Sequence, residues 1–352
     1  MTALPHIVAL ATARPDHDIH ASFIAWASGR FDDARERRLF ERMAERSGIR
    51  HRWSVLPPTP GGGSPVDAGG FYAGGQLPPT SVRMNAYAEH APRLALEAIA
   101  KLSFDPASIT HIVVASCTGF VAPGIDQIIA RQLGLGPHVE RLLIGFMGCY
   151  AGVTALRAAR HIVRSESDAR VLLVSVELST LHLEDTRQIE PLLAMLQFSD
   201  GAAAAIISAD AGPVALGDGL SLALPQSDEL IRWDIGEQGF VMRLSGEVPA
   251  RIETALANDD AKAALFGDAV PANLAIHAGG RSILDAVERA MALTPDALAS
   301  SRAVLAECGN MSSATVLFAI ERLVDQGAVG PGLALAFGPG LAAEAIKLDF
   351  TP

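Results

Sequence analysis

The chain has 352 residues, of which 49% are hydrophobic and 19% charged, and its formal net charge is −11. This length and composition are typical of a folded α/β protein with a large buried core and exclude a disordered chain. The negative charge argues against general binding to nucleic acid or to anionic lipid, so an anionic ligand would need a local basic patch.

Cysteine usage and the N-terminal segment indicate where the protein resides. The three cysteines form neither a C-x-x-C pair nor a disulfide framework, which favours a reducing compartment. The apolar run that begins at His6 is short and follows no basic segment, so we interpret it as a first strand and not as a signal peptide. Since no uninterrupted apolar stretch reaches about 18 residues, we expect a cytoplasmic protein without membrane insertion.

Apolar runs rich in β-branched residues alternate with helical patterns along the chain. The runs predict strands that begin near residues 6, 111, 141, 170, 201, 273, 302 and 333. Helical patterns include residues 86–102 and 280–293. This alternation predicts layers of helices on β-sheet, and the nearly continuous apolar character of the strands predicts that both faces of the sheet are covered.

Two changes of composition indicate how the chain is organised. Residues 57–80 are rich in Gly and Pro and predict an excursion loop. A less regular stretch begins after residue 212, where we place a boundary between an N-terminal part, residues 1–212, and a C-terminal part, residues 213–352. We expect the two parts to share one core.

Cys149 lies in the segment "MGCYAG", between a predicted strand and a helical pattern. The N–H groups at a helix N-terminus stabilise a thiolate, and Gly148 and Gly152 would leave room for a substrate to approach the sulfur. The alternative is that Cys149 is a small apolar residue filling a tight turn. This segment by itself leaves both interpretations open.

His277 and Asn310 are two further polar residues that follow predicted strands and precede helical patterns. The alternative for His277 is a structural histidine held by hydrogen bonds, and the alternative for Asn310 is a residue that caps the following helix. Ligands bind at the strand ends of layered α/β folds. The shared placement of Cys149, His277 and Asn310 therefore predicts one joint active site.

Six segments, in this order and spacing, resemble the type III polyketide synthases, the chalcone-synthase-like branch of the thiolase-fold superfamily. They are "SCTGFVAPGID", "GFMGCYAG", "LQFSDGAAAAII", "IHAGGRSIL", "ECGNMSSATV" and "AFGPGLAAEAI". The resemblance extends from about residue 36 to the C-terminus. It implies an α/β, thiolase-like layered αβαβα fold built from two similar halves, and a homodimer.

The resemblance also implies the catalytic roles. Cys149 matches the nucleophile that accepts an acyl group from a CoA thioester, His277 and Asn310 match the pair that binds the thioester carbonyl, and Phe198 matches an aromatic gatekeeper. An imidazolium at His277 would keep the Cys149 thiol ionised. Donors on His277 and Asn310 would stabilise the enolate of decarboxylating malonyl-CoA by roughly 3–4 kcal/mol each. No metal or redox cofactor is required.

An arginine stripe is the candidate site for the phosphates of coenzyme A. Arg38, Arg42 and Arg46 recur every four residues, and the resemblance places Arg42 and Arg46 at positions that bind these phosphates. The alternative is a solvated helix face on which Glu41 and Glu45 pair with the arginines.

Departures from the plant members of the family concern the pocket. Cys117 replaces a threonine, and Met242 replaces a second gatekeeping phenylalanine, which would let a long acyl chain pass. Ser179, His182 and Ser312 align with other pocket positions. These changes predict a fatty acyl-CoA starter, extended with malonyl-CoA to alkylpyrones or alkylresorcinols. The alternative is a synthase that forms tetrahydroxynaphthalene from malonyl-CoA alone.

Three other functions compete with this prediction. A carrier-protein-dependent ketoacyl synthase shares the fold, but the "FGPG" segment near the C-terminus disfavours it. A cysteine protease has the same chain order of Cys, His and Asn, but an alanine-rich sequence without a disulfide framework disfavours a secreted protease. A catalytically inactive binding protein is disfavoured because all three polar residues are present.

Overall fold

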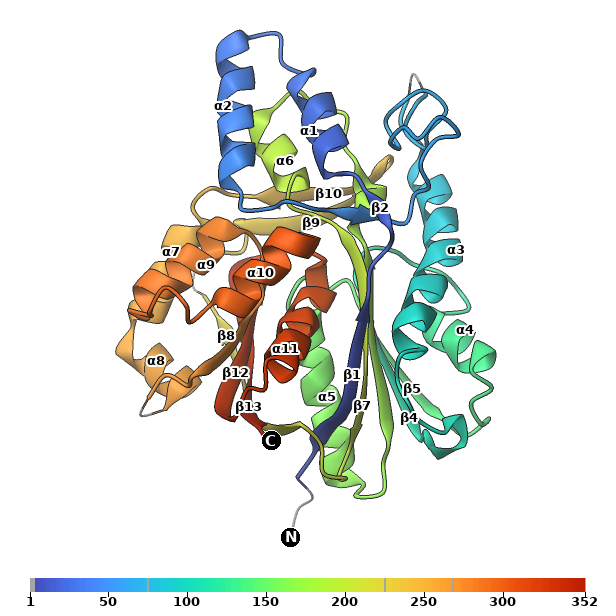
Figure 1. Cartoon of the computed structure of the whole chain (residues 1–352), viewed down its shortest axis with the longest axis vertical. Helices are drawn as coiled ribbons and strands as arrows, with labels where there is room; N and C mark the ends of the chain where they lie inside the picture. Colours follow the sequence, from blue (N-terminus) through green and yellow to red (C-terminus); the bar gives the residue numbers. More distant parts are fainter. Residues whose placement is uncertain (1–3, 75, 225, 268, 352) are drawn as a thin grey trace.

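A computed structural model describes residues 4–351 except residues 75, 225 and 268 (Figure 1). Nine strands form one sheet in the order β11-β12-β13-β8-β1-β7-β6-β4-β5. Their bounds are β1 His6–Ala13, β4 His111–Ser116, β5 Glu140–Gly145, β6 Val171–Leu178, β7 Asp200–Ser208, β8 Val214–Ala223, β11 Asn273–Ile276, β12 Gly330–Gly338 and β13 Ala342–Phe350. Two short ribbons pair β2 (His17–Asp18) with β3 (Trp53–Ser54), and β9 (Ile231–Gly236) with β10 (Gly239–Leu244).

The large sheet has two parts that meet at a narrow junction. Strands β1 and β8 pair at His6 with Ala215 and at Ile7 with Val214. In the first part β4 is parallel to both β5 and β6, and in the second part β11 is parallel to β12. The carboxyl ends of parallel strands lie at one edge of a sheet, and the segments that follow β4, β5 and β11 carry the predicted site.

Helices cover both parts of the sheet and fill the space between them. Their bounds are α1 His20–Ser28, α2 Ala34–Arg46, α3 Thr80–Ile99, α4 Ile125–Gln132, α5 Ala151–Ser165, α6 Ile189–Met195, α7 Val248–Ala257, α8 Asp259–Phe266, α9 Arg281–Ala290, α10 Ala299–Cys308 and α11 Thr315–Asp325. Helix α5 contacts β4 and β6 of the first part and β13 of the second, while α11 contacts α5, β1 and β11. Helices α3 and α4 lie on one outer side and α7 to α10 on the other (Figure 1). The order of layers is therefore helix, sheet, helix, sheet, helix, as the resemblance implied.

Alternating side chains of the strands divide the core into a central and two outer layers. In β6, Val171 and Leu173 pack in the central core with α5 and α11, whereas Leu172 and Val174 face the core under α3. In β12 the alanines face the central helices and the leucines face α9. Because β4, β6 and β7 are buried along their whole length, the expected covering of both faces is confirmed for them.

Strand β5 differs from this expectation. It lies at the edge of the sheet, and of its six residues Ile144 is the one that is buried. Leu142 and Leu143 are 42% and 46% exposed. An apolar run therefore marks this strand correctly but does not show that both of its faces are covered by the same chain.

The strand predicted near residue 302 is wrong, because these residues belong to α10. Short apolar runs do not separate a strand from a buried helix by periodicity. Val304, Leu305 and Cys308 are buried at helical spacing. Asn310 thus follows a helix and not a strand.

Residues 57–79 contain neither helix nor strand where they are described, which confirms the predicted loop. The predicted boundary at residue 212 falls in the connection between β7 and β8. None of the described helices has the length and apolar character needed to cross a membrane.

Candidate active site

Cys149 lies in the turn between β5 and α5, as the sequence predicted, and is half-buried. Gly148 holds this turn at a φ of +84°, which favours glycine, and its carbonyl oxygen accepts a 3.0 Å hydrogen bond from Ala151 N–H. A Cβ atom at Gly148 would lie 2.3 Å from Cδ of Pro339. The "FGPG" segment is therefore packed directly against the nucleophile turn.

Gly152 has a different role from the one expected. A Cβ atom at this position would lie 2.2 Å from the backbone oxygen of Ser313. The glycine in the first turn of α5 thus makes room for the backbone that follows Asn310, and not for a substrate. This close approach brings the C-terminal part of the chain to the Cys149 turn.

Asn310 is held in place by four hydrogen bonds. Its Nδ2 donates to the carbonyl oxygen of Gly279 at 3.2 Å, and its Oδ1 accepts from Ser312 N–H at 2.8 Å. Its backbone N–H donates to Gln197 at 2.8 Å, and its carbonyl accepts from Ser199 N–H at 2.9 Å. The amide is 2% exposed and lies beside the Phe198 segment.

His277 directly follows β11, and its N–H donates to Leu335 O at 2.8 Å. The imidazole is 1% exposed, and neither ring nitrogen has a hydrogen-bond partner among the residues that the structure describes. A Cβ atom at Gly279 would lie 3.4 Å from His277 Nε2, and the oxygen of Gly279 binds Asn310. His277 and Asn310 therefore meet at Gly279, and a buried imidazole without a partner indicates a site for a ligand.

The charge states of Cys149 and His277 differ from the expected ion pair. Burial raises the pKa of Cys149 to about 12, although the adjoining side chains of Ser312 and Asn310 lower it. Burial lowers the pKa of His277 to about 3. Burial disfavours the charged form of each group, so these shifts favour a neutral thiol and a neutral imidazole in the resting site, in place of the imidazolium that the resemblance implied.

Cys117 lies behind the nucleophile turn. Its Sγ accepts a 3.0 Å hydrogen bond from Gly148 N–H, and burial raises the pKa of this thiol well above its ordinary value. The backbone N–H of Cys117 donates to Glu177 Oε2 at 2.9 Å. Cys117 thus supports the turn that presents Cys149 and is not among the residues that line the adjacent cavity.

Glu177 is a buried residue that the sequence analysis did not single out. Its carboxylate accepts hydrogen bonds from Cys117 N–H, from the Thr118 hydroxyl at 2.8 Å and from the Ser313 hydroxyl. Burial raises its pKa to about 7. The signal was present in the sequence as one acidic residue within the apolar run of β6.

A mainly apolar cavity lies next to the Phe198 segment. Four of the predicted pocket residues line it, namely Phe198, Met242, Ser179 and His182. Its other walls come from the β9–β10 ribbon, from α6 and from the loop of residues 57–79. Trp233 and Phe240 of the β9–β10 ribbon and Tyr72 of the loop were not predicted, because no motif of the sequence marked them.

His182 is held as a structural group within this cavity. Its Nε2 lies 2.8 Å from Thr118 O, and its Nδ1 accepts from Phe240 N–H at 3.0 Å. Its ring stacks on Phe240 with 4.2 Å between the centroids. Burial lowers the pKa of His182 to about 3, so the ring is neutral.

The predicted phosphate-binding residues lie on α2. Arg42 and Arg46 are exposed, and Arg46 lines a surface hollow together with Gln197 and Arg281. The carbonyl of Gln197 binds Asn310, so this hollow adjoins the catalytic segment. Arg42 is not among the residues that line the hollow.

The arrangement of a cysteine, an asparagine and an unpaired imidazole, with Asn310 paired to the Phe198 segment that lines an apolar cavity, agrees with comparisons to known proteins. Two family models, "Chalcone and stilbene synthases, N-terminal domain" and "C-terminal domain", match residues 3–211 and 219–351. The chain belongs to the chalcone and stilbene synthase family. It is a type III polyketide synthase, an acyltransferase-type condensing enzyme.

Individual relatives show the range of this family. An "Alpha-pyrone synthesis polyketide synthase-like Pks18" of Mycobacterium tuberculosis is 32% identical over 285 residues, which cover 76% of this chain and 72% of that protein. A "Bisdemethoxycurcumin synthase" of Oryza sativa subsp. japonica is 35% identical over 305 residues, covering 78% and 75%. The crystal structure of PKS-I from the brown alga Ectocarpus siliculosus superposes with a TM-score of 0.88 at 28% identity, covering 100% of this chain and 99% of that one.

The charge states predict how Cys149 reacts with iodoacetamide. Because the thiol is neutral and its pKa is raised, the thiolate fraction grows about tenfold per pH unit. The alkylation rate of Cys149 should therefore rise without a plateau between about pH 6 and pH 9. Peptide mass spectrometry separates Cys149 from the buried Cys117 and Cys308. A rate that is already constant at neutral pH would show a thiolate–imidazolium pair and contradict the neutral state.

Proposed function

We propose that this polyketide synthase loads a fatty acyl-CoA starter on Cys149, extends it with malonyl-CoA and cyclises the product to an alkylpyrone or alkylresorcinol. The observation that carries the proposal is the placement of Cys149 next to Asn310, with His277 joined to Asn310 through Gly279. The alternative, a tetrahydroxynaphthalene-forming enzyme, uses malonyl-CoA as starter as well as extender, so the starter that the cavity accepts distinguishes the two.

In the loading step, Sγ of Cys149 attacks the thioester carbonyl while the thiol proton passes to the neutral imidazole of His277. The carbon–sulfur bond to coenzyme A breaks, and the departing thiolate takes the proton back. A neutral imidazole is the form that accepts a proton, so the lowered pKa of His277 suits it to this task. The acyl group is then held as a thioester on Cys149.

In the extension step, malonyl-CoA loses carbon dioxide and leaves an enolate whose oxygen is stabilised by Nδ2–H of Asn310 and by His277. The enolate carbon attacks the carbonyl carbon of the acyl thioester, the carbon–sulfur bond to Cys149 breaks, and the departing Cys149 thiolate takes a proton from water. Because the donors are positioned before the reaction and buried from water, their stabilisation of the developing charge is large. None of these steps needs a metal or a redox cofactor.

The exposed guanidinium groups near the site support binding of coenzyme A. Arg46 and Arg281 line the same hollow beside Gln197, and Arg42 lies one turn earlier on α2. Guanidinium groups bind phosphate oxygens through paired hydrogen bonds. The hollow adjoins the segment of Asn310, so a pantetheine arm that enters there would reach the site.

The apolar cavity supports a starter with a hydrocarbon chain. Phe198 and Met242 lie on its wall, and Val66 belongs to the loop that closes it. Met242 is unbranched and flexible, so it adapts to a passing chain. An apolar wall also keeps water from the acyl thioester. That one relative is named for α-pyrone synthesis agrees with this choice.

The decisive experiment incubates the enzyme with malonyl-CoA and a panel of acyl-CoAs and identifies the products by mass spectrometry. We expect pyrones or resorcinols that carry the alkyl chain of a fatty starter, and a loss of turnover of about a hundredfold or more in His277→Ala because an oxyanion donor is removed. His138→Ala, which changes an exposed histidine, serves as the control.

Three outcomes would contradict this proposal. Tetrahydroxynaphthalene from malonyl-CoA alone would exclude the fatty starter. Turnover of acyl carrier-protein substrates but not of acyl-CoA would favour the ketoacyl synthase. Full activity of His277→Ala would exclude the role of this imidazole.

We further propose that the enzyme is a homodimer that forms through the exposed edge of β5. Phe120, Leu142, Leu143 and Phe146 expose between 36% and 46% of their surface, and the rings of Phe120 and Phe146 lie 5.6 Å apart. An edge strand with apolar side chains is a template for pairing with another chain. A second copy that pairs here would cover the face that this chain leaves open.

The oligomeric state tests this surface. Light scattering after size exclusion should give the wild-type protein twice the mass of one chain. Leu143→Lys should lower the measured mass toward that of one chain, because the dimer would bury the charge of the lysine. Val329→Lys is the matched control, since Val329 is 58% exposed on the turn between α11 and β12. A wild-type monomer, or a dimer unchanged by Leu143→Lys, would contradict the proposal.

We propose that the enzyme resides in the cytoplasm. All three cysteines are free in the described chain, and the reaction needs Cys149 as a thiol. Both observations suit the reducing cytoplasm.

A further inference from the structure

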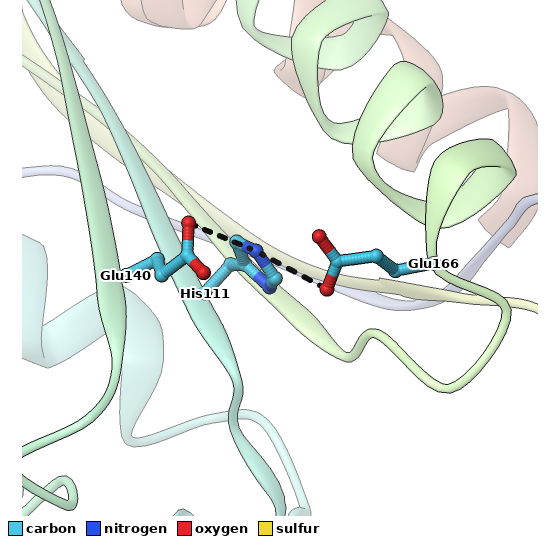
Figure 2. A group of neighbouring side chains, drawn as sticks. All are labelled: His111, Glu140 and Glu166. Atoms are coloured by element: carbon cyan, nitrogen blue, oxygen red, sulfur yellow. Dashed lines mark ion pairs between the residues drawn. The ribbon is translucent and has the colours of Figure 1, made fainter.

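Three side chains with metal-binding atoms converge at the end of the sheet opposite Cys149. His111 begins β4 and Glu140 begins β5, and the two residues are paired in register. Glu166 is the C-cap of α5. Figure 2 shows the imidazole of His111 lying between the two carboxylates. Three segments that are distant in sequence therefore supply one nitrogen and two carboxylates to one place.

The distances between these side chains are too long for hydrogen bonds and are close to those between two ligands of one ion. His111 Nε2 lies 3.7 Å from Glu140 Oε2 and 3.9 Å from Glu166 Oε2, and all three ligand atoms lie within 4.8 Å of one another. Two atoms bound tetrahedrally to one zinc ion lie about 3.4 Å apart, given metal–ligand bonds near 2.1 Å. Small rotations of the two exposed glutamates would close this difference.

The orientation of the imidazole is fixed from the other side. His111 is 6% exposed, and its Nδ1 lies 2.8 Å from the Thr110 hydroxyl. That hydroxyl accepts from Arg170 N–H at 2.9 Å, and when it donates to Arg170 O, 3.3 Å away, it accepts from Nδ1–H in the tautomer that leaves Nε2 free for a metal. A hydrogen bond of this kind to the second nitrogen is typical of metal-binding histidines.

This tautomer directs the lone pair of Nε2 toward two anionic groups. A lone pair that faces two carboxylates is repelled unless a cation or a proton lies between them. Two carboxylates and a neutral imidazole balance the charge of a divalent cation. The glutamate side chains are 72% and 59% exposed and line a surface hollow, so an ion enters from solvent and keeps a position for water.

We propose that His111, Glu140 and Glu166 form a binding site for a divalent transition metal of the zinc class. Imidazole and carboxylate are a ligand set for Zn²⁺, which takes four ligands when water completes the site. The ion would cross-link the first residues of β4 and β5 to the residue that ends α5. Because α5 begins two residues after Cys149, this cross-link would fix the C-terminal end of the helix that follows the nucleophile turn. Its role is structural and independent of the condensation chemistry.

The test uses the full chain from which metal has been removed with a chelator. Zn²⁺ is titrated into it, and its binding is measured by calorimetry and by competition with a chromophoric chelator. We expect one ion per chain and a higher midpoint of thermal unfolding, because an ion that binds the folded state stabilises it. His111→Gln and Glu166→Gln should each weaken binding about tenfold or more and abolish the shift. His90→Gln, which changes a histidine of α3 outside the cluster, should leave both unchanged.

Two results would overturn the proposal. One is a folded wild-type chain that binds no Zn²⁺, because the three side chains would then lie together without an ion. The other is binding that persists undiminished in Glu166→Gln, an exposed substitution that should not disturb folding. Binding of Co²⁺ in place of Zn²⁺ is an independent measurement, because the visible absorption of Co²⁺ reports its nitrogen and oxygen ligands.

Discussion

A buried carboxylate holds the two parts of the chain in register at the active site. Glu177 of β6 accepts hydrogen bonds from Cys117 and Thr118, which follow β4, and from Ser313, which follows Asn310. Cys117 supports the turn of Cys149 through its hydrogen bond with Gly148, and Ser313 lies in the segment that carries the amide of Asn310. Burying a carboxylate is costly unless its oxygens are hydrogen-bonded. The three donors therefore both stabilise Glu177 and position the catalytic segments relative to each other.

Close backbone packing completes this arrangement. Gly152 allows α5 to approach the oxygen of Ser313, and Gly148 allows the turn to pack on Pro339. His277 and Asn310 are consequently buried at the junction of two layers, and Cys149 is half-buried there. Burial favours the neutral forms of the thiol and the imidazole, so the fixed donors act on charge that develops during the reaction.

Much of this organisation could be predicted from the sequence, because it depends on local pattern. Strands β1, β4 to β7, β11 and β12 and the turns at Cys149 and His277 follow from apolar runs bounded by glycine or polar residues, and the loop predicted over residues 57–80 follows from its Gly and Pro content. The helix at residues 299–308 was missed because a short run of Ala, Val and Leu suits either a strand or a buried helix. The exposure of β5 was missed because an apolar run does not show what covers it.

The charge state of the site and the role of Glu177 depend on tertiary contacts and were not predictable from spacing. Burial of His277 is a property of the surrounding layers and not of the segment "IHAGG". Likewise, the three donors to Glu177 are 59 to 136 residues away in the sequence. The proposed zinc-class site likewise depends on tertiary contacts, because His111, Glu140 and Glu166 belong to no common sequence motif.

The central claim is that Cys149, held at this junction, is the residue that carries the acyl group. Incubation with a fatty acyl-CoA in the absence of malonyl-CoA, followed by peptide mass spectrometry, tests it directly. The account predicts one acyl group per chain on the Cys149 peptide and none in Cys149→Ala. An acyl group on Cys117 or Cys308, or acylation that survives in Cys149→Ala, would contradict it.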